Sequence, residues 1–123
     1  IEKTAAAIAS IYGADVSFEW KDFTSPLVND PEASAEAAEV AARLFGADKV
    51  DRNRPFSLGG DDFAEFIIHT PGVYAYVGSG NKAKPDTCVA HHNNRFDIDE
   101  DALVVAAALH AAYAVNFLNG TIG

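Results

Sequence analysis

Two prolines in one short segment, Pro26 and Pro31, restrict the fold of this chain more than any other feature. Proline removes a backbone N–H donor and fixes φ, so no regular helix or central strand can run through residues 25–31. We therefore place the main boundary here and predict two structural units, residues 1–28 and residues 29–123.

The first unit is predicted to hold one helix and one strand. Apolar residues recur at helical spacing in residues 1–12, and Gly13 is a residue that commonly ends a helix. Residues 16–23 then alternate between apolar and polar side chains, which is typical of a strand with one wet face. We expect this segment to be an edge strand that pairs with a neighbouring chain or is poorly ordered.

The second unit alternates helices with strands, which favours an α/β fold over a bundle or a sandwich. Asp30 before Pro31 predicts the start of an Ala-rich helix that Gly46 ends, and a long helix is predicted over residues 100–118. Residues 73–77 form an uncharged apolar run between them. We expect this run to be an interior strand of the main sheet, covered by both helices.

Charge and composition exclude several classes of protein. Asp and Glu number 18 against 9 Lys and Arg, so the net charge of -9 argues against a nucleic-acid partner. The longest low-charge run, residues 102–118, contains His110 and Asn116, and no membrane span is predicted. A single cysteine, Cys88, and the lack of a signal segment predict a cytoplasmic protein. Methionine is absent and the sequence opens inside a helical pattern, so we expect a piece of a longer polypeptide.

A pair of histidines is the strongest candidate for chemistry. His91 and His92 lie in a polar segment with Asp86, Asn93 and Asp97, residue types that bind or orient a transition metal. Adjacent side chains of an extended segment point to opposite sides, so at most one histidine can be a ligand. The spacing matches no complete zinc motif, and surface or capping histidines are the alternative.

Other candidates carry weaker signals. The run Gly59-Gly60-Asp61-Asp62 precedes a short helix, and its carboxylates disfavour a phosphate site, which leaves a capped helix as the simple interpretation. Cys88 and His91 suggest a thiol nucleophile with a base, but without an orienting group a free, half-buried thiol is favoured.

Three segments together resemble the C-terminal part of the metal-dependent amidohydrolases of the M20 peptidase family, especially the aminoacylase, hippurate hydrolase and auxin-conjugate hydrolase branch. They are residues 58–63, residues 71–81 and residues 91–103. The resemblance implies the C-terminal part of a phosphorylase/hydrolase-like catalytic domain, a mixed sheet flanked by helices. Residues 1–28 would then be the helix and strand that remain of an α+β lid domain.

The resemblance also implies an activity, the hydrolysis of the amide bond of N-acyl amino acids by a metal-activated water. Two divalent metal ions, zinc or in this branch manganese or nickel, would serve it. Counting back from Phe96, the family's metal-binding histidine aligns with His92, and Gly59, Gly60 and Asp61 would lie near the bound substrate. Asn94 departs from the family, whose loop usually has proline there.

The family's other metal ligands and its water-activating glutamate lie upstream of these motifs and do not occur in this sequence. We therefore expect a fragment that is inactive alone, from an enzyme able to form a homodimer through its lid domain. A non-catalytic binding or oligomerisation module is the main alternative, and a hydrolase that uses Cys88 ranks last. We further predict that His92 projects toward a groove outlined by residues 59–62 and the loop after Val77, while His91 points elsewhere.

Overall fold

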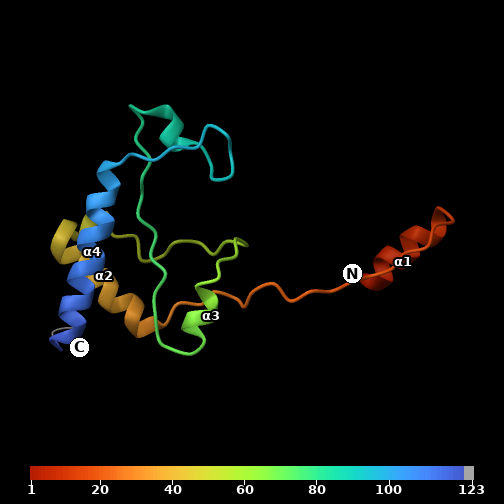
Figure 1. The fold of residues 1–123 in the computed structure, drawn as a ribbon, viewed down its shortest axis with the longest axis horizontal. Coiled ribbons are helices and arrows are strands. Elements are labelled where there is room, and N and C mark those ends of the chain that lie inside the picture. Colours follow the sequence, from red (N-terminus) through yellow and green to blue (C-terminus); the bar gives the residue numbers. More distant parts are fainter. Residues whose placement is uncertain (121–123) are drawn as a thin grey trace.

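The structure, a computed structural model, describes residues 1–120. Its elements in chain order are α1 (Glu2–Ile11), α2 (Pro31–Phe45), η1 (Ala47–Lys49), α3 (Ala64–Ile67), η2 (Pro85–Cys88) and α4 (Asp101–Leu118). Helices α2 and α4 lie side by side, and α1 stands apart at the end of a long extended segment (Figure 1).

Helix α2 begins and ends where the sequence predicts. Asp30 caps it, because its Oδ1 accepts the Ala33 N–H at 2.9 Å, and Pro31 occupies the first turn, where no donor is needed. Gly46 follows the last residue with φ of 98°, a conformation that side-chain-bearing residues rarely adopt. These local signals act within a few residues, which is why they could be read from the sequence.

Most of the buried apolar residues of the described chain lie on α2, which packs against α4, and one more, Ala64, lies on α3. Ala33, Ala37 and Val40 recur along one face of α2 and are buried, and Val40 is only 2% exposed. The alanines let α4 approach closely. Tyr113 on α4 donates its hydroxyl to Glu36 Oε2 at 3.2 Å, and burial together with this carboxylate raises the pKa of the tyrosine.

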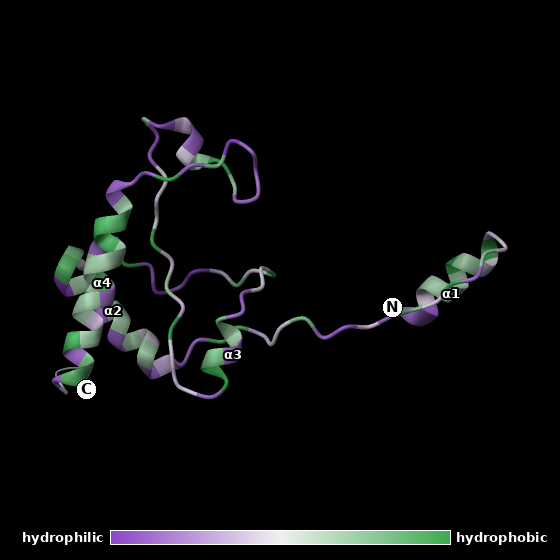
Figure 2. Cartoon of the chain, viewed as in Figure 1, coloured by the Kyte–Doolittle hydropathy of each residue, from purple (hydrophilic) through white to green (hydrophobic). Residues whose placement is uncertain are grey.

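Helix α4 keeps a large apolar surface in solvent. The apolar colouring in Figure 2 runs along much of the helix, and its exposed residues include Leu103, Val104, Val115, Phe117 and Leu118. By length and composition alone α4 could cross a membrane, but an apolar helix of a protein core meets the same criterion. The prediction that this run does not span a membrane stays a prediction.

The two predicted strands do not form within residues 1–120. Neither residues 16–23 nor residues 73–77 form a strand, and the one bridge in the described chain is the isolated pair Asn81 and Lys84. A strand needs a partner backbone for its hydrogen bonds, and neither segment finds one here. The expected interior position of residues 73–77 in a sheet is therefore not observed.

Aromatic side chains two residues apart nevertheless lie on the same side in both segments, as they would in a strand. Phe18 stacks on Trp20 with ring centroids 6.3 Å apart, and Tyr74 meets Tyr76 edge to face at 5.3 Å. Extended backbone places residues i and i+2 on the same side, so both contacts follow from the period of two. The pattern predicted the backbone conformation but could not supply a pairing partner.

Helix α1 also forms as predicted and is followed by Gly13 with φ of 62°. The Trp20 indole N–H donates to Glu2 Oε1 at 2.6 Å, which brings the extended segment back toward the start of the helix. No residue of α1 is buried in the described chain. The division into residues 1–28 and residues 29–123 stays a prediction.

Candidate functional site

The predicted metal ligand lies in a segment that we call the histidine loop, residues 89–97. Asp86 closes this loop, because its carbonyl accepts the Asp97 N–H at 3.3 Å and its Oδ1 pairs with Arg95 Nη2 at 2.5 Å. Within the loop the His91 ring lies 4.6 Å from the Phe96 ring. The loop thus has a defined path although it contains no regular element.

His92 itself has an unusual backbone. Its φ of 63° lies in the left-handed region, and no other non-glycine residue of the described chain has a positive φ. This conformation costs free energy for a residue with a side chain and occurs more often at functional sites than elsewhere. The side chain of His92 is exposed.

Asp99, which lies two residues before α4 and is 9% exposed, binds the chain that precedes η2 through its carboxylate. Asn81 Nδ2 donates to its Oδ2 at 2.6 Å, and Lys84 Nζ donates to its Oδ1 at 2.5 Å. Both hydrogen bonds favour the ionised form and hold the pKa of Asp99 below its usual value. Thr87, which is buried, joins the same cluster by donating to Lys84 O at 2.7 Å.

The second predicted site is the glycine turn, residues 59–62, which precedes α3. Asp61 shapes it with both carboxylate oxygens: Oδ1 accepts the Phe63 N–H and Oδ2 accepts the Tyr74 hydroxyl, each at 2.9 Å. The hydrogen bond to Asp61 raises the pKa of Tyr74. A Cβ on Gly60 would lie 3.4 Å from Thr24 Cγ2, so the turn packs closely against the chain that precedes α2.

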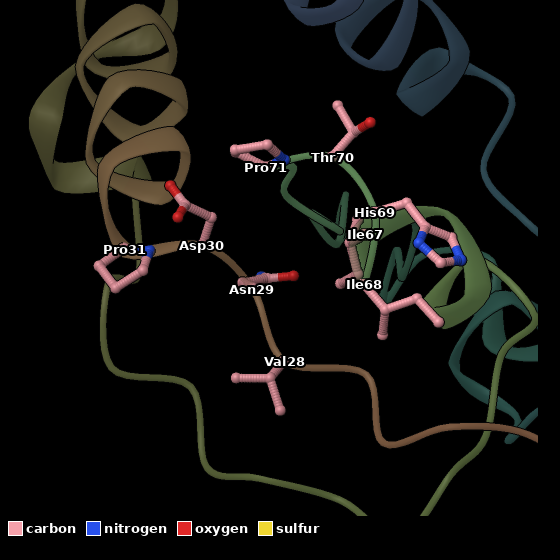
Figure 3. Close-up of a pocket in the computed structure, with 9 residues that line it drawn as sticks. All are labelled: Val28, Asn29, Asp30, Pro31, Ile67, Ile68, His69, Thr70 and Pro71. Carbon is pink, nitrogen blue, oxygen red and sulfur yellow. The ribbon is translucent and has the colours of Figure 1, made fainter.

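That preceding chain, residues 24–30, is called the boundary segment here. The Ser25 N–H donates to Glu65 Oε1 at 2.7 Å, and this bond contributes most to lowering the pKa of Glu65. Residues 28–31 and residues 67–71 line a surface hollow, with Asn29 and Asp30 on one side and Ile68 and His69 on the other (Figure 3). The boundary segment is thus attached to the part of the chain that carries the glycine turn.

The donor set for a metal is incomplete in this part of the protein. Within residues 1–120 no group of at least three His, Cys, Asp or Glu side chains is arranged to hold a metal ion. A zinc site needs at least three protein ligands, and His92 would supply one of them. The other ligands would have to come from outside residues 1–120. No interaction described for residues 1–120 joins His92 to the glycine turn, and the groove predicted between them remains a prediction.

Several residues of these clusters were missed by sequence reasoning. Asn29, Tyr74, Glu65 and Asp99 each act through partners 13 to 45 residues away. No spacing rule connects such pairs, so the sequence held no signal for them. Cys88 was expected to be half-buried, but it is exposed, because its neighbour Thr87 and not the thiol is turned into the cluster.

Comparison with known proteins identifies the family. The sequence profile of Peptidase family M20/M25/M40 matches residues 3–116, nearly the whole chain. The chain belongs to the M20 peptidase family. Membership confirms the predicted resemblance and implies an α/β hydrolase-like fold for the complete domain.

Individual M20 relatives support the assignment. The chain is 31% identical to "Thermostable carboxypeptidase 2" of Saccharolobus solfataricus over 97% of its length and 29% of the relative's. It is 33% identical to the N-acetylcysteine deacetylase of Bacillus subtilis over 94% of this chain and 28% of that protein. It is 30% identical to the Arabidopsis thaliana "IAA-amino acid hydrolase ILR1-like 4" over 94% of this chain and 26% of that protein.

The chain therefore spans less than a third of the length of these curated relatives. No solved structure matches the chain. The relatives are named a carboxypeptidase, a deacetylase and an amino acid hydrolase, so the chain is similar to parts of hydrolases.

Proposed function

We propose that this chain is the C-terminal part of a metal-dependent amidohydrolase that cleaves the amide bond of N-acyl amino acids. The observation that carries the proposal is the M20 match together with the relatives, because one is named a deacetylase of N-acetylcysteine and another a hydrolase of IAA-amino acids. A carboxypeptidase among the relatives makes peptides the competing substrate class.

The proposed role of His92 is to supply one imidazole ligand to a metal site completed by residues outside this chain. Divalent metals, zinc or else manganese or nickel, would polarise the scissile carbonyl and lower the pKa of the attacking water when bound. The exposed position of His92 at the strained point of a closed loop supports this role.

We propose that the glycine turn lies beside the bound substrate. Gly59 and Gly60 have no side chains to obstruct a ligand, and Asp61 holds the turn through Phe63 and Tyr74. Because both oxygens of Asp61 already accept hydrogen bonds, its contribution is to fix the backbone next to the substrate.

The remaining parts of the proposal concern the whole protein. Residues 1–28 belong to a lid domain and residues 29–123 to the catalytic domain, and the lid domain provides a homodimer contact. The protein acts in the cytoplasm on a small molecule, without nucleic-acid or membrane partners. The net charge of -9 supports the exclusion of nucleic acid.

The test uses the complete protein that contains this chain. N-acetylated amino acids should be hydrolysed faster than unblocked dipeptides, and a chelator should abolish the activity. His92→Ala should remove most turnover and lower the bound metal, whereas His91→Ala, the matched control one residue away, should cost at most about 10- to 100-fold. Loss of metal from His91→Ala, with normal metal content in His92→Ala, would exchange the assigned roles.

A binding or oligomerisation module remains the second candidate. It is favoured by the exposed apolar residues of α4 and by the lack of a ligand cluster within residues 1–120. Light scattering of the 123-residue chain would report stable self-association for such a module. Restored hydrolysis when the chain is joined to the upstream part of its protein would support the enzyme instead.

A further inference from the structure

Tyr74 connects two parts of the chain that the proposed function does not relate to each other. Its hydroxyl donates to Asp61 Oδ2 at 2.9 Å, and so it binds the carboxylate oxygen that does not accept the Phe63 N–H. The ring also lies 5.8 Å from the Phe63 ring. The orientation of Asp61 therefore depends on the position of Tyr74.

The position of Tyr74 is set in turn by Asn29. The Tyr74 N–H donates to Asn29 Oδ1 at 2.8 Å, and Asn29 Nδ2 donates to the Tyr74 carbonyl at 3.0 Å. One side-chain amide thus satisfies both backbone groups of Tyr74, as a neighbouring strand would. Next to this pair the Asp30 N–H donates to Gly72 O at 3.0 Å.

The two ends of the boundary segment contact the same region of the chain. Asn29 binds Tyr74 near the end of the segment, and Ser25 binds Glu65 of α3 near its start. Thr24 Oγ1 donates to the Asp61 carbonyl oxygen at 3.4 Å. The methyl group of Thr24 lies so close to Gly60 that a Cβ on this glycine would contact it. A shift of the boundary segment would therefore be transmitted to the glycine turn.

We propose that Tyr74 is a positioning residue that couples Asn29 of the boundary segment to Asp61, and so sets the conformation of the glycine turn against the substrate. This inference rests on the proposed function for its substrate part. Its structural part, the coupling of Asn29 to the turn through Tyr74, holds whether or not the protein hydrolyses N-acyl amino acids.

The experiment compares Tyr74→Phe with Tyr76→Phe in the complete protein that contains this chain. Both variants lose one hydroxyl, but within the described residues Tyr76 is 59% exposed and contacts other side chains only through its ring, against Tyr74 and Arg54. Amide hydrogen exchange at Phe63 and Ala64 is measured without substrate, and KM and kcat are measured with an N-acetyl amino acid.

Tyr74→Phe should speed exchange at both amides and raise KM about 3- to 10-fold with kcat little changed, the effect of one lost hydrogen bond on ground-state binding. Tyr76→Phe should change neither quantity. Equal exchange rates and equal KM values in the two variants would overturn the proposal.

A second variant, Asn29→Asp, tests the other end of the coupling. By itself it should speed exchange at Phe63, and unchanged exchange there would overturn the coupling even if Tyr74→Phe does not fold. Asn29→Asp keeps the shape and the acceptor for the Tyr74 N–H but removes the donor to the Tyr74 carbonyl. Its effects on Phe63 exchange should not add to those of Tyr74→Phe, because both act through the same contact. Simple additivity would refute the coupling. If the parent protein hydrolyses no N-acyl amino acid, the proposed function fails while the exchange data still decide the coupling.

Discussion

Val40→Ala tests whether the contact between α2 and α4 is the core of this chain. Val40 is 2% exposed, so the substitution removes two methyl groups from a closed environment. Burial of these two groups contributes about 1.6 kcal/mol to the free energy of unfolding, at about 0.8 kcal/mol per group, and the substitution removes this contribution. The cavity left between two helices that relax only in part raises the loss, while the better helix propensity of alanine returns about 0.5 kcal/mol. We expect a net loss of about 2 kcal/mol.

The measurement is urea unfolding followed by far-UV circular dichroism, with the midpoint and slope compared between variants. Leu44→Ala is the matched control, because Leu44 lies on the same helix but is 45% exposed, and its loss should stay below about 1 kcal/mol. If Val40→Ala destabilised the protein less than Leu44→Ala, the face of α2 that we assign to the core would not be its buried face in solution.

Three further predictions concern single contacts. Asp30→Ala should lower the free energy of unfolding by about 1 kcal/mol, because the Ala33 N–H loses its capping acceptor. Asp30→Ser restores an acceptor and should regain most of this loss, which thermal unfolding of both variants would measure. Gly46→Ala should destabilise by about 1–2 kcal/mol, since φ is 98° and the new Cβ would lie 2.7 Å from Asp48 Oδ1, whereas Gly78→Ala in open space should be near neutral in the same assay. The pKa of Asp99 is lowered in the folded protein, so its contribution to the free energy of unfolding is fully present above the ordinary carboxyl pKa. This contribution is lost as pH falls through the lower pKa of the folded state. Asp99→Asn should therefore weaken the fall of the melting temperature at acidic pH.

The parts of the fold that the sequence predicted are those controlled within a few residues. Asp30, Pro31 and Gly46 define α2 through capping and backbone conformation alone, and the apolar spacing of residues 1–12 defines α1. The predicted strands do not form within residues 1–120 for the complementary reason. Residues 73–77 have the composition of a buried strand, but a strand is completed by another backbone, and no local pattern specifies which one.

The candidate site divides in the same way. The family motifs placed His92 in a loop and Asp61 in a turn before a helix, and both positions are observed. What holds them could not be predicted, because Asp61 depends on Tyr74, and Tyr74 depends on Asn29, which is 45 residues away. Hydrogen bonds over such separations arise only after the chain has folded.

Trp20, the only tryptophan of the chain, also determines what optical spectroscopy can report. It is 63% exposed and hydrogen bonded to Glu2, and it stacks on Phe18, so its indole senses the α1 region and none of the α2 and α4 contact. Its emission is an indicator of that region alone. Intrinsic fluorescence and far-UV dichroism would consequently follow different parts of the molecule, and their midpoints would coincide only if both parts unfold in one cooperative step.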